Sequence, residues 1–146
     1  VKVTLDGKVV AESPLVATGM EVRVAQDSGR VVLTRHAGTV KAVDALRIVV
    51  TTNKDKEGDQ DEYNLITFRK TNDNTVFHQR PVVAVGARVK TGDLLADTSS
   101  SVNGQLAVGQ NVLVAFMSWG GANYEDAIII SERLVKQQVF SSIYIE

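Results

Sequence analysis

The stretch Thr39-Val40-Lys41-Ala42-Val43-Asp44-Ala45-Leu46-Arg47-Ile48-Val49-Val50-Thr51 decides the fold class of this chain. It holds two short valine-rich runs, which the pair Asp44-Ala45 separates. β-Branched residues suit the pleated, half-buried surface of a sheet. The stretch therefore predicts two successive β-strands, and residues 47–51 are the denser candidate.

Short strands and turns continue on both sides of that stretch. Residues 2–10 alternate around the turn Asp6-Gly7, which is a hairpin pattern, and residues 21–25 alternate like a strand. Residues 52–62 are highly charged and predict a solvated hairpin tip. A calcium-binding loop is the alternative for that tip, although the spacing does not fit the twelve-residue calcium-loop pattern.

The rest of the chain has the same character. Further strand candidates are residues 63–69 and 106–115. Between them lie the apolar segments 81–89, which Gly86 interrupts, and 94–96, with turn-forming residues at 91–93. Only residues 131–138 have a helical pattern, with Ser131 at the position of an N-cap. The predicted fold is mainly β, a closed or nearly closed antiparallel barrel or sandwich with one short C-terminal helix.

Composition limits the function classes. The 146 residues suit one domain with a real core. The formal net charge of −1 lacks the basic excess of a self-sufficient nucleic-acid binder, so any nucleic-acid contact is expected to be local or shared with a partner. Cysteine is absent, which excludes disulfides and cysteine ligands and suits a reducing cytoplasm. No apolar stretch approaches the roughly 20 residues of a membrane span.

The two ends of the sequence suggest a piece of a longer chain. The first residues, Val1-Lys2-Val3, contain neither an initiator methionine nor a signal-peptide pattern. The last residues, 141–146, still alternate like a strand. We therefore expect a processed or excised segment.

An adjacent pair of acids is the main candidate for chemistry. Glu125 and Asp126 follow a glycine-rich turn and precede the apolar run 127–130, which predicts a buried strand. Carboxylates at the edge of a buried strand commonly serve cations, phosphates or proton transfer. The alternative interpretation is a polar turn that starts a strand, because an isolated acid pair is a weak motif.

Several motifs resemble, in the same order, those of the bacterial RNA polymerase β subunit family. The longest, at residues 123–135, reads Asn-Tyr-Glu-Asp-Ala-Ile-Ile-Ile-Ser-Glu-Arg-Leu-Val and is similar to the family's segment near the active centre. The resemblance covers about residues 13 to 146. The other matching motifs are residues 14–21, 27–29, 74–75, 79–81, 92–97 and 106–111.

The chain departs from the family pattern in several places. The family has Pro-Trp-Asn-Gly or a close variant before the acidic pair, whereas this chain has Ser118-Trp119-Gly120-Gly121. Loss of the proline and gain of a glycine should loosen that turn. Residues 1–12 do not match, and the family's Asn-Met-Gln-Arg-Gln run and later lysine-bearing segments are absent from this sequence.

The resemblance implies a fold and a division into parts. Residues 1–12 would be an N-terminal hairpin outside the family pattern. Residues 13–146 would be a β-barrel segment of the catalytic core, in the region that binds the RNA–DNA hybrid. That segment would be double-psi β-barrel-like, with inserted barrel-sandwich elements.

The resemblance also implies a function, DNA-templated RNA synthesis by nucleotidyl transfer, with the fragment alone inactive. The principal Mg²⁺ would lie on an aspartate triad of the β′ subunit. Glu125 and Asp126 would support the second metal and the incoming nucleoside triphosphate, with Asp126 acting through water and no metal bound directly. Arg80 and Gln79 would contact nucleic acid.

The partners that the resemblance implies are the β′ subunit, the α subunits and other polymerase subunits, together with template DNA, transcript and nucleoside triphosphates. The location would be the bacterial cytosol or nucleoid, with no membrane contact. Two other hypotheses stay open. The chain is an interaction module for other subunits or transcription factors, or it is a stand-alone β-barrel.

Simpler roles compete for several of these residues. Arg80 has the alternative of bonding a turn carbonyl, and Asn74 and Gln79 have the alternative of fixing a loop. His36 and His78 have no partner pattern and are expected to be solvent or turn histidines. Trp119 is expected to anchor the core, because a single aromatic residue makes a poor base-stacking platform.

Overall fold

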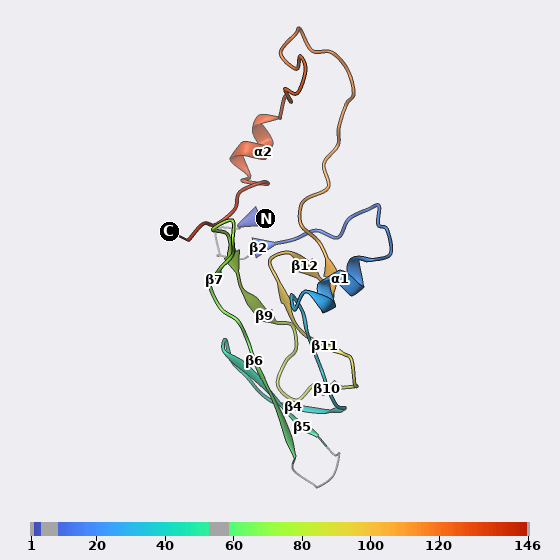
Figure 1. Cartoon of the computed structure of the whole chain (residues 1–146), viewed down its shortest axis with the longest axis vertical. Coiled ribbons are helices and arrows are strands. Elements are labelled where there is room, and N and C mark those ends of the chain that lie inside the picture. Colours follow the sequence, from blue (N-terminus) through green and yellow to red (C-terminus); the bar gives the residue numbers. More distant parts are fainter. Residues whose placement is uncertain (1, 4–8, 53–58, 146) are drawn as a thin grey trace.

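The computed structural model describes residues 2–3, 9–52 and 59–145 (Figure 1). Within these ranges the chain forms thirteen short strands and two short helices, and every pairing between strands is antiparallel. The prediction of a mainly β fold is therefore confirmed. The strands are β1 Lys2–Val3, β2 Val9–Val10, β3 Val32–Leu33, β4 Gly38–Val43, β5 Arg47–Thr52, β6 Gln60–Asn64, β7 Arg69–Lys70, β8 Val76–Phe77, β9 Gln79–Pro81, β10 Arg88–Val89, β11 Leu94–Thr98, β12 Ser101–Val102 and β13 Gln105–Leu106; the helices are α1 Glu21–Asp27 and α2 Glu132–Lys136.

The largest sheet has the strand order β10-β4-β5-β6. Its central pair, β4 and β5, contains the two strands predicted from residues 39–51. Gly38 begins β4 at a close approach of two backbones, because a Cβ at this position would meet the carbonyl oxygen of Thr51 and lie 2.9 Å from Cγ1 of Val50. β5 and β6 form the arms of the predicted hairpin, and residues 53–58 at its tip lie outside the described residues.

The core lies between this sheet and the three-stranded sheet β3-β11-β9. Alternation along β5 buries Ile48 and Val50, while β11 contributes Leu95 and Ala96 from the opposite side. Burying an aliphatic side chain of this size stabilises the fold by about 1.5–3 kcal/mol relative to leaving it exposed. The two sheets therefore form a small sandwich whose interior is mostly aliphatic, with Tyr63 as its aromatic member.

Helix α1 contradicts the prediction of a strand at residues 21–25. The described chain therefore has two helices, α1 and α2, where the sequence predicted one. Val22 and Val24 alternate in the sequence, but both remain partly exposed in the helix. Ala25 is the buried residue, where α1 packs against β13. The alternation of Val22 and Val24 predicted a strand wrongly, because neither valine side chain is buried in the core.

The start of α1 is closed by the carboxylate of Glu21. It accepts hydrogen bonds from the backbone N–H of Thr18 at 2.8 Å, the hydroxyl of Thr18 at 2.9 Å and the backbone N–H of Gly19 at 2.9 Å. These bonds, led by the one from the Thr18 backbone, lower the pKa of Glu21 to about 2. Residues 14–21, one of the motifs that resemble the family, thus end in a loop that hydrogen bonds between Glu21 and residues 18–19 close.

We expect the carboxylate of Glu21 to titrate near pH 2 in the folded protein, below the value of about 4.3 for a free glutamate. Because the folded-state pKa is the lower one, the stabilising contribution is present above about pH 4.3 and is lost as the pH falls through about 2. Carbon-13 NMR titration of the glutamate side chains measures this midpoint, and Glu21→Gln identifies the signal. A midpoint near 4.3 would contradict the closed loop.

The N-terminal pairing follows the predicted hairpin, with Lys2 opposite Val10 and Val3 opposite Val9. The predicted turn at Asp6-Gly7 lies outside the described residues. The division of the chain at residue 12 stays a prediction.

A long arm, residues 112–131, leaves the sheets after β13 and returns into α2 (Figure 1). The arm contains no strand, so the strands predicted at residues 127–130 and over most of 106–115 are wrong. The predicted C-terminal helix is confirmed as α2, although Ser131 at its N-cap makes no side-chain capping bond within the described chain. No described helix is long and apolar enough to cross a membrane.

Candidate functional site

The acidic pair lies in a tight turn of the arm, where the backbone N–H of Ala127 donates to the carbonyl of Tyr124 at 3.3 Å. Glu125 has a φ of +58°, a left-handed conformation that is uncommon for a residue with a side chain. Both acids are exposed, and neither carboxylate forms a hydrogen bond or ion pair with another described residue. Ile128 is 83% exposed, so the acids do not border a buried strand, contrary to the prediction.

The turn before the pair is closed by the side chain of Asn123. Its Oδ1 accepts a hydrogen bond from the backbone N–H of Trp119 at 2.8 Å, and its Nδ2 donates to the carbonyl of Met117 at 2.7 Å. Gly120 and Gly121 have φ values of +54° and +77°, which glycine adopts without steric cost. Trp119 is 61% exposed, so the prediction that it anchors the core is wrong.

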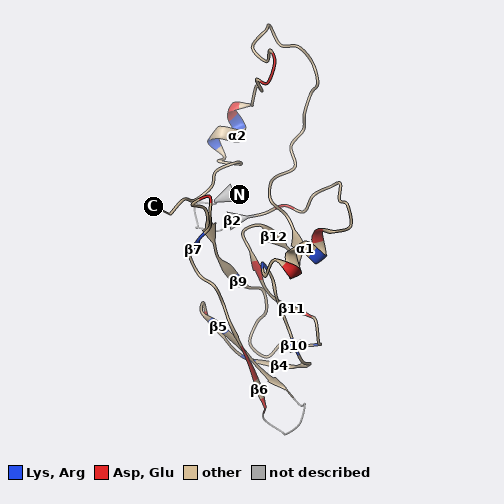
Figure 2. Cartoon of the chain, in the orientation of Figure 1, with Lys and Arg blue, Asp and Glu red and all other residues tan. Residues whose placement is uncertain are grey.

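Charge on the arm is concentrated in this turn. Glu125 and Asp126 are the only charged residues in the sequence of residues 112–131, and Figure 2 shows the red segment on the returning limb of the arm. Carboxylate oxygens are hard ligands that suit Mg²⁺, which retains several waters and takes one or two protein carboxylates. The donor set therefore fits a supporting contact to a hydrated magnesium ion.

A complete metal site would need further ligands from water or from groups outside this chain, because two adjacent carboxylates fill only part of an octahedral shell. Among the described residues, no group of three or more His, Asp or Glu side chains is arranged to hold a metal ion.

The base of the arm is tied to the N-terminal segment through Asn111. Its backbone N–H donates to the carboxylate of Glu12 at 3.0 Å, and its Nδ2 donates to the carbonyl of Ser13 at 2.9 Å. The Oδ1 of Asn111 accepts from the backbone N–H of Leu15 at 3.3 Å. Two motifs of the resemblance, residues 14–21 and 106–111, thus meet at the point where the arm begins.

Gln79 and Arg80 lie on β9, in the middle of the molecule, whereas the acidic pair lies on the arm that projects from one end (Figures 1 and 2). Gln79 is buried, its Oε1 accepting from the backbone N–H of Ile66 at 2.9 Å and its Nε2 donating to the carbonyl of Gly29 at 3.0 Å. These bonds give Gln79 the loop-fixing role. Arg80 is exposed, and it is the one of the two placed to meet another molecule.

His36 lies in the bend between β3 and β4, which agrees with the turn alternative of the prediction, but it is half-buried and has a partner. Its Nδ1 lies 2.8 Å from Oδ2 of Asp61, which also accepts a hydrogen bond from the Tyr63 hydroxyl at 3.1 Å. Burial raises the pKa of Asp61, but the bonds from His36 and Tyr63 outweigh it and hold this pKa below its usual value. The Tyr63 hydroxyl in turn accepts from the backbone N–H of Arg35 at 2.7 Å. The cluster fastens the β3–β4 connection to β6.

Sequence reasoning missed the two asparagines that shape the arm. Asn123 lies within the longest motif, and side-chain bonding of an asparagine to nearby backbone is a local signal that could have identified it. Asn111 and the pair His36–Asp61 join segments that are distant in sequence. No local pattern in a single sequence indicates pairs of residues that lie far apart along the chain.

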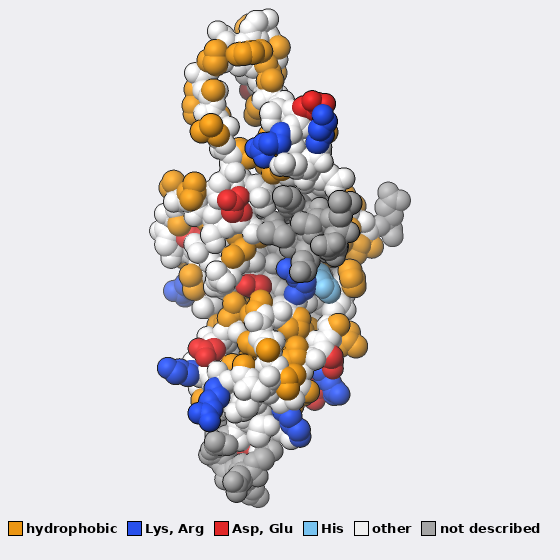
Figure 3. Space-filling model, turned by 180° about the vertical axis from the view of Figure 1, so that it is seen from behind, with side chains coloured by type: hydrophobic (Ala, Val, Ile, Leu, Met, Phe, Trp, Pro, Cys, Tyr) orange, Lys and Arg blue, Asp and Glu red, His pale blue; other side chains and the backbone are white. Residues whose placement is uncertain are grey.

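Most apolar side chains of the arm are exposed, and Figure 3 shows apolar side chains gathered on the protruding loop. Examples are Phe116 and Leu113, which are essentially fully exposed. Contiguous exposed apolar surface of this kind marks an interaction site in soluble proteins. The exposed members are Val112, Leu113, Val114, Phe116, Met117, Trp119, Tyr124, Ile128, Ile129 and Ile130.

Comparison with known proteins places this geometry in a family. The family model of RNA polymerase Rpb2, domain 6, matches residues 33–146. The DNA-directed RNA polymerase subunit beta of Geotalea daltonii is 56% identical over 140 residues, which cover 93% of this chain and 10% of the relative. That of Geobacter sulfurreducens is 55% identical over 140 residues, with the same coverage, 93% and 10%.

A more distant relative gives the same picture. The DNA-directed RNA polymerase subunit beta of Acetivibrio thermocellus is 51% identical over 135 residues, covering 92% of this chain and 11% of that protein. The chain thus spans about a tenth of the length of the curated relatives that it matches. It belongs to the RNA polymerase Rpb2 domain 6 family.

Proposed function

We propose that this chain is a segment of the β subunit of a DNA-directed RNA polymerase, an enzyme of DNA-templated nucleotidyl transfer. The observation that carries the proposal is identity of about half the residues or more to such subunits over 92–93% of the chain. The activity belongs to the assembled enzyme, with the segment inactive alone. Its partners would be the β′ subunit, the α subunits, template DNA, transcript and nucleoside triphosphates, in the bacterial cytosol or nucleoid.

Within that enzyme, the arm presents Glu125 and Asp126 at the active centre. When bound, Mg²⁺ supplies charge stabilisation at the reacting phosphate, and its principal ligands would belong to the β′ subunit. The Asp126 carboxylate would accept hydrogen bonds from water bound to the second metal, and would thereby help to position the triphosphate. The bonds of Asn123 support this role because they hold the preceding turn in one conformation.

The finer fold follows from the same proposal. The described sheets contain two to four strands each, and such small sheets leave many edges open. We infer that other parts of the subunit complete a double-psi β-barrel around them and cover the apolar side chains of the arm. Arg80, exposed on β9, would contact a nucleic-acid phosphate, whereas the buried amide of Gln79 supports the strand that carries it.

A chimeric enzyme tests the proposal. Residues 12–146 replace the matching segment in the β subunit of Geotalea daltonii, and the polymerase is assembled and purified. Because the two segments are 56% identical, we expect the chimera to assemble and to synthesise RNA on a DNA template. A chimera with the same residues in scrambled order serves as the negative control. An assembled chimera that does not extend a primer would contradict the proposal.

An interaction module is the second candidate, and the exposed apolar arm favours it. Pull-down with the β′ catalytic part separates the two, using Asp126→Ala and Phe116→Glu versions of the chimera. Binding that is lost with Phe116→Glu and unchanged by Asp126→Ala, together with normal RNA synthesis by the latter, favours the interaction module.

A further inference from the structure

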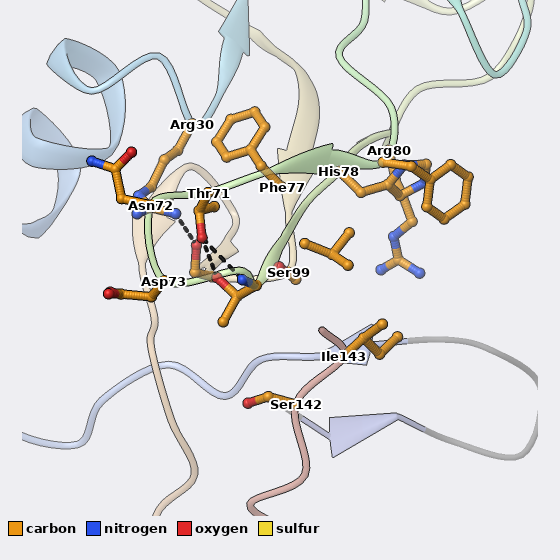
Figure 4. A pocket seen from close by; sticks show the side chains of 14 residues that line it. Arg30, Thr71, Asn72, Asp73, Phe77, His78, Arg80, Ser99, Ser142 and Ile143 are labelled. Atoms are coloured by element: carbon orange, nitrogen blue, oxygen red, sulfur yellow. Dashed lines mark hydrogen bonds between the residues drawn. The ribbon is translucent and has the colours of Figure 1, made fainter. Parts of the chain in front are cut away.

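A cavity of about 480 Å³ lies beside the β7–β8 hairpin, away from the arm (Figure 4). Its volume falls in the range of about 300–1,000 Å³ that is typical of small-molecule sites. The C-terminal segment forms one wall, because Tyr144 pairs with Thr75 and the backbone N–H of Ile145 donates to the carbonyl of Asn74 at 2.8 Å. Ser142 and Ile143 thereby line the cavity.

One end of the cavity presents a stacked pair of rings. Phe68 and His78 flank the hairpin, with ring centroids 4.5 Å apart and planes inclined by 27°. Phe68 has a φ of +50° and is 70% exposed, so a strained backbone holds an apolar ring in the open. Strain of this kind concentrates at sites where the structure positions a side chain for a ligand.

The same end is polar and positive. His78 Nδ1 is buried and has no hydrogen-bond partner among the described residues. Burial and then the charge of Arg80 lower the pKa of His78, so the imidazole is neutral at pH 7 and the guanidinium of Arg80 supplies the positive charge. Arg80 also lines the cavity.

The other end carries a second cation. Figure 4 shows Arg30 and Arg80 at opposite ends, with Phe77 and His78 between them. The guanidinium of Arg30 lies 6.0 Å from the ring centre of Phe77 and donates to the hydroxyl of Ser100. Asp73 is the one acid among the described residues that line the cavity, so positive charge exceeds negative charge in this set.

We propose that this cavity binds a small planar anion whose ring stacks on Phe68 and whose acid group pairs with Arg80. A stacking surface beside a guanidinium recognises a flat ring and a negative group together. Cavity size favours a small molecule over a polynucleotide. The inference goes beyond the proposed function. It assigns Arg80 to the anion of a small molecule, whereas the proposed function assigns it to a nucleic-acid phosphate, and competition with an oligonucleotide distinguishes the two.

The test uses the complete subunit that carries this chain and the probe 1-naphthyl phosphate, with affinity measured by saturation-transfer NMR titration. We expect 1-naphthol, which lacks the anion, and inorganic phosphate, which lacks the ring, to bind at least about tenfold more weakly than the probe. Arg80→Gln should weaken binding of the probe about tenfold, and Phe68→Leu about fivefold.

Matched controls make the outcome decisive. Arg23→Gln removes an exposed arginine of α1 that does not line the cavity, and it should leave the affinity within about twofold. Because Phe68 and Arg80 are exposed, their substitutions do not disturb the core. The proposal is overturned if the probe does not bind, if the three variants bind it equally, or if inorganic phosphate binds as tightly as the probe. It is also overturned if a single-stranded oligonucleotide binds at this cavity more tightly than the probe and displaces it.

Discussion

Replacing Asp126 with alanine in the complete polymerase is expected to slow nucleotide addition by about 10- to 100-fold at limiting magnesium, the usual range for losing a group that orients a metal through its ligands. The carboxylate is exposed and makes no bond with another described residue, so its removal leaves the arm's own hydrogen bonds intact. Excess magnesium and nucleotide should restore much of the rate, because they compensate for weaker orientation.

Rapid-quench measurement of single-nucleotide addition, over a range of magnesium concentrations, checks this result. Glu132→Gln is the matched control, since it removes one exposed negative charge on α2, six positions from Asp126. Glu125→Gly adds a second test, because glycine accepts the φ of +58° while losing the carboxylate. An Asp126→Ala rate equal to that of the unsubstituted enzyme at low magnesium would refute the assigned role.

Replacing Ile48 with alanine is expected to reduce the free energy of unfolding of the sandwich by about 2–5 kcal/mol. Ile48 is fully buried on β5 and packs in the cluster that includes Leu95 of the facing sheet. Alanine would leave a cavity between the two sheets, which neighbouring side chains fill only in part. The loss is large because a small sandwich has few other fully buried residues of this size.

Hydrogen exchange of the complete subunit, followed by mass spectrometry, measures the effect in peptides from residues 38–52 and 59–64. Val49→Ala is the control on the same strand, because Val49 is only partly buried and points away from Ile48. We expect it to cost less than about 1.5 kcal/mol, the lower end for deleting buried methyl groups. If both variants lose the same protection against hydrogen exchange, burial of Ile48 is not a main source of the sandwich's free energy of unfolding.

Sequence patterns predicted the parts of the fold in which local preference and burial agree. Strand β5 follows its valine run, because alternate side chains reach the core and the other face stays half exposed. Strand β4 also follows its run, although only Val40 is buried and a bulge between Val40 and Ala42 interrupts the alternation. The prediction failed at α1, where Val22 and Val24 alternate without facing a sheet, and Ala25 alone is buried. Alternation over five residues does not distinguish a strand from a helix whose apolar side chains remain exposed.

The arm shows the opposite failure. Residues 127–130 are apolar enough for a buried strand, yet the described chain offers them no neighbouring strand and no cover. Apolar composition predicts that a segment is buried, but it does not identify the surface that covers the segment. For the same reason Trp119 was predicted in the core and is found exposed.

The sequence by itself determined the mainly β class, the valine strands, the short C-terminal helix and the family, because these depend on local periodicity and on motifs that stay in order along the chain. Only the tertiary structure decided that Asn111 closes the base of the arm and that the acids stand exposed on it, far from Arg80. It also decided that Phe68 and His78 stack beside a cavity. These features require contacts or separations between segments whose positions are set by sheet pairing, and no local preference specifies that pairing.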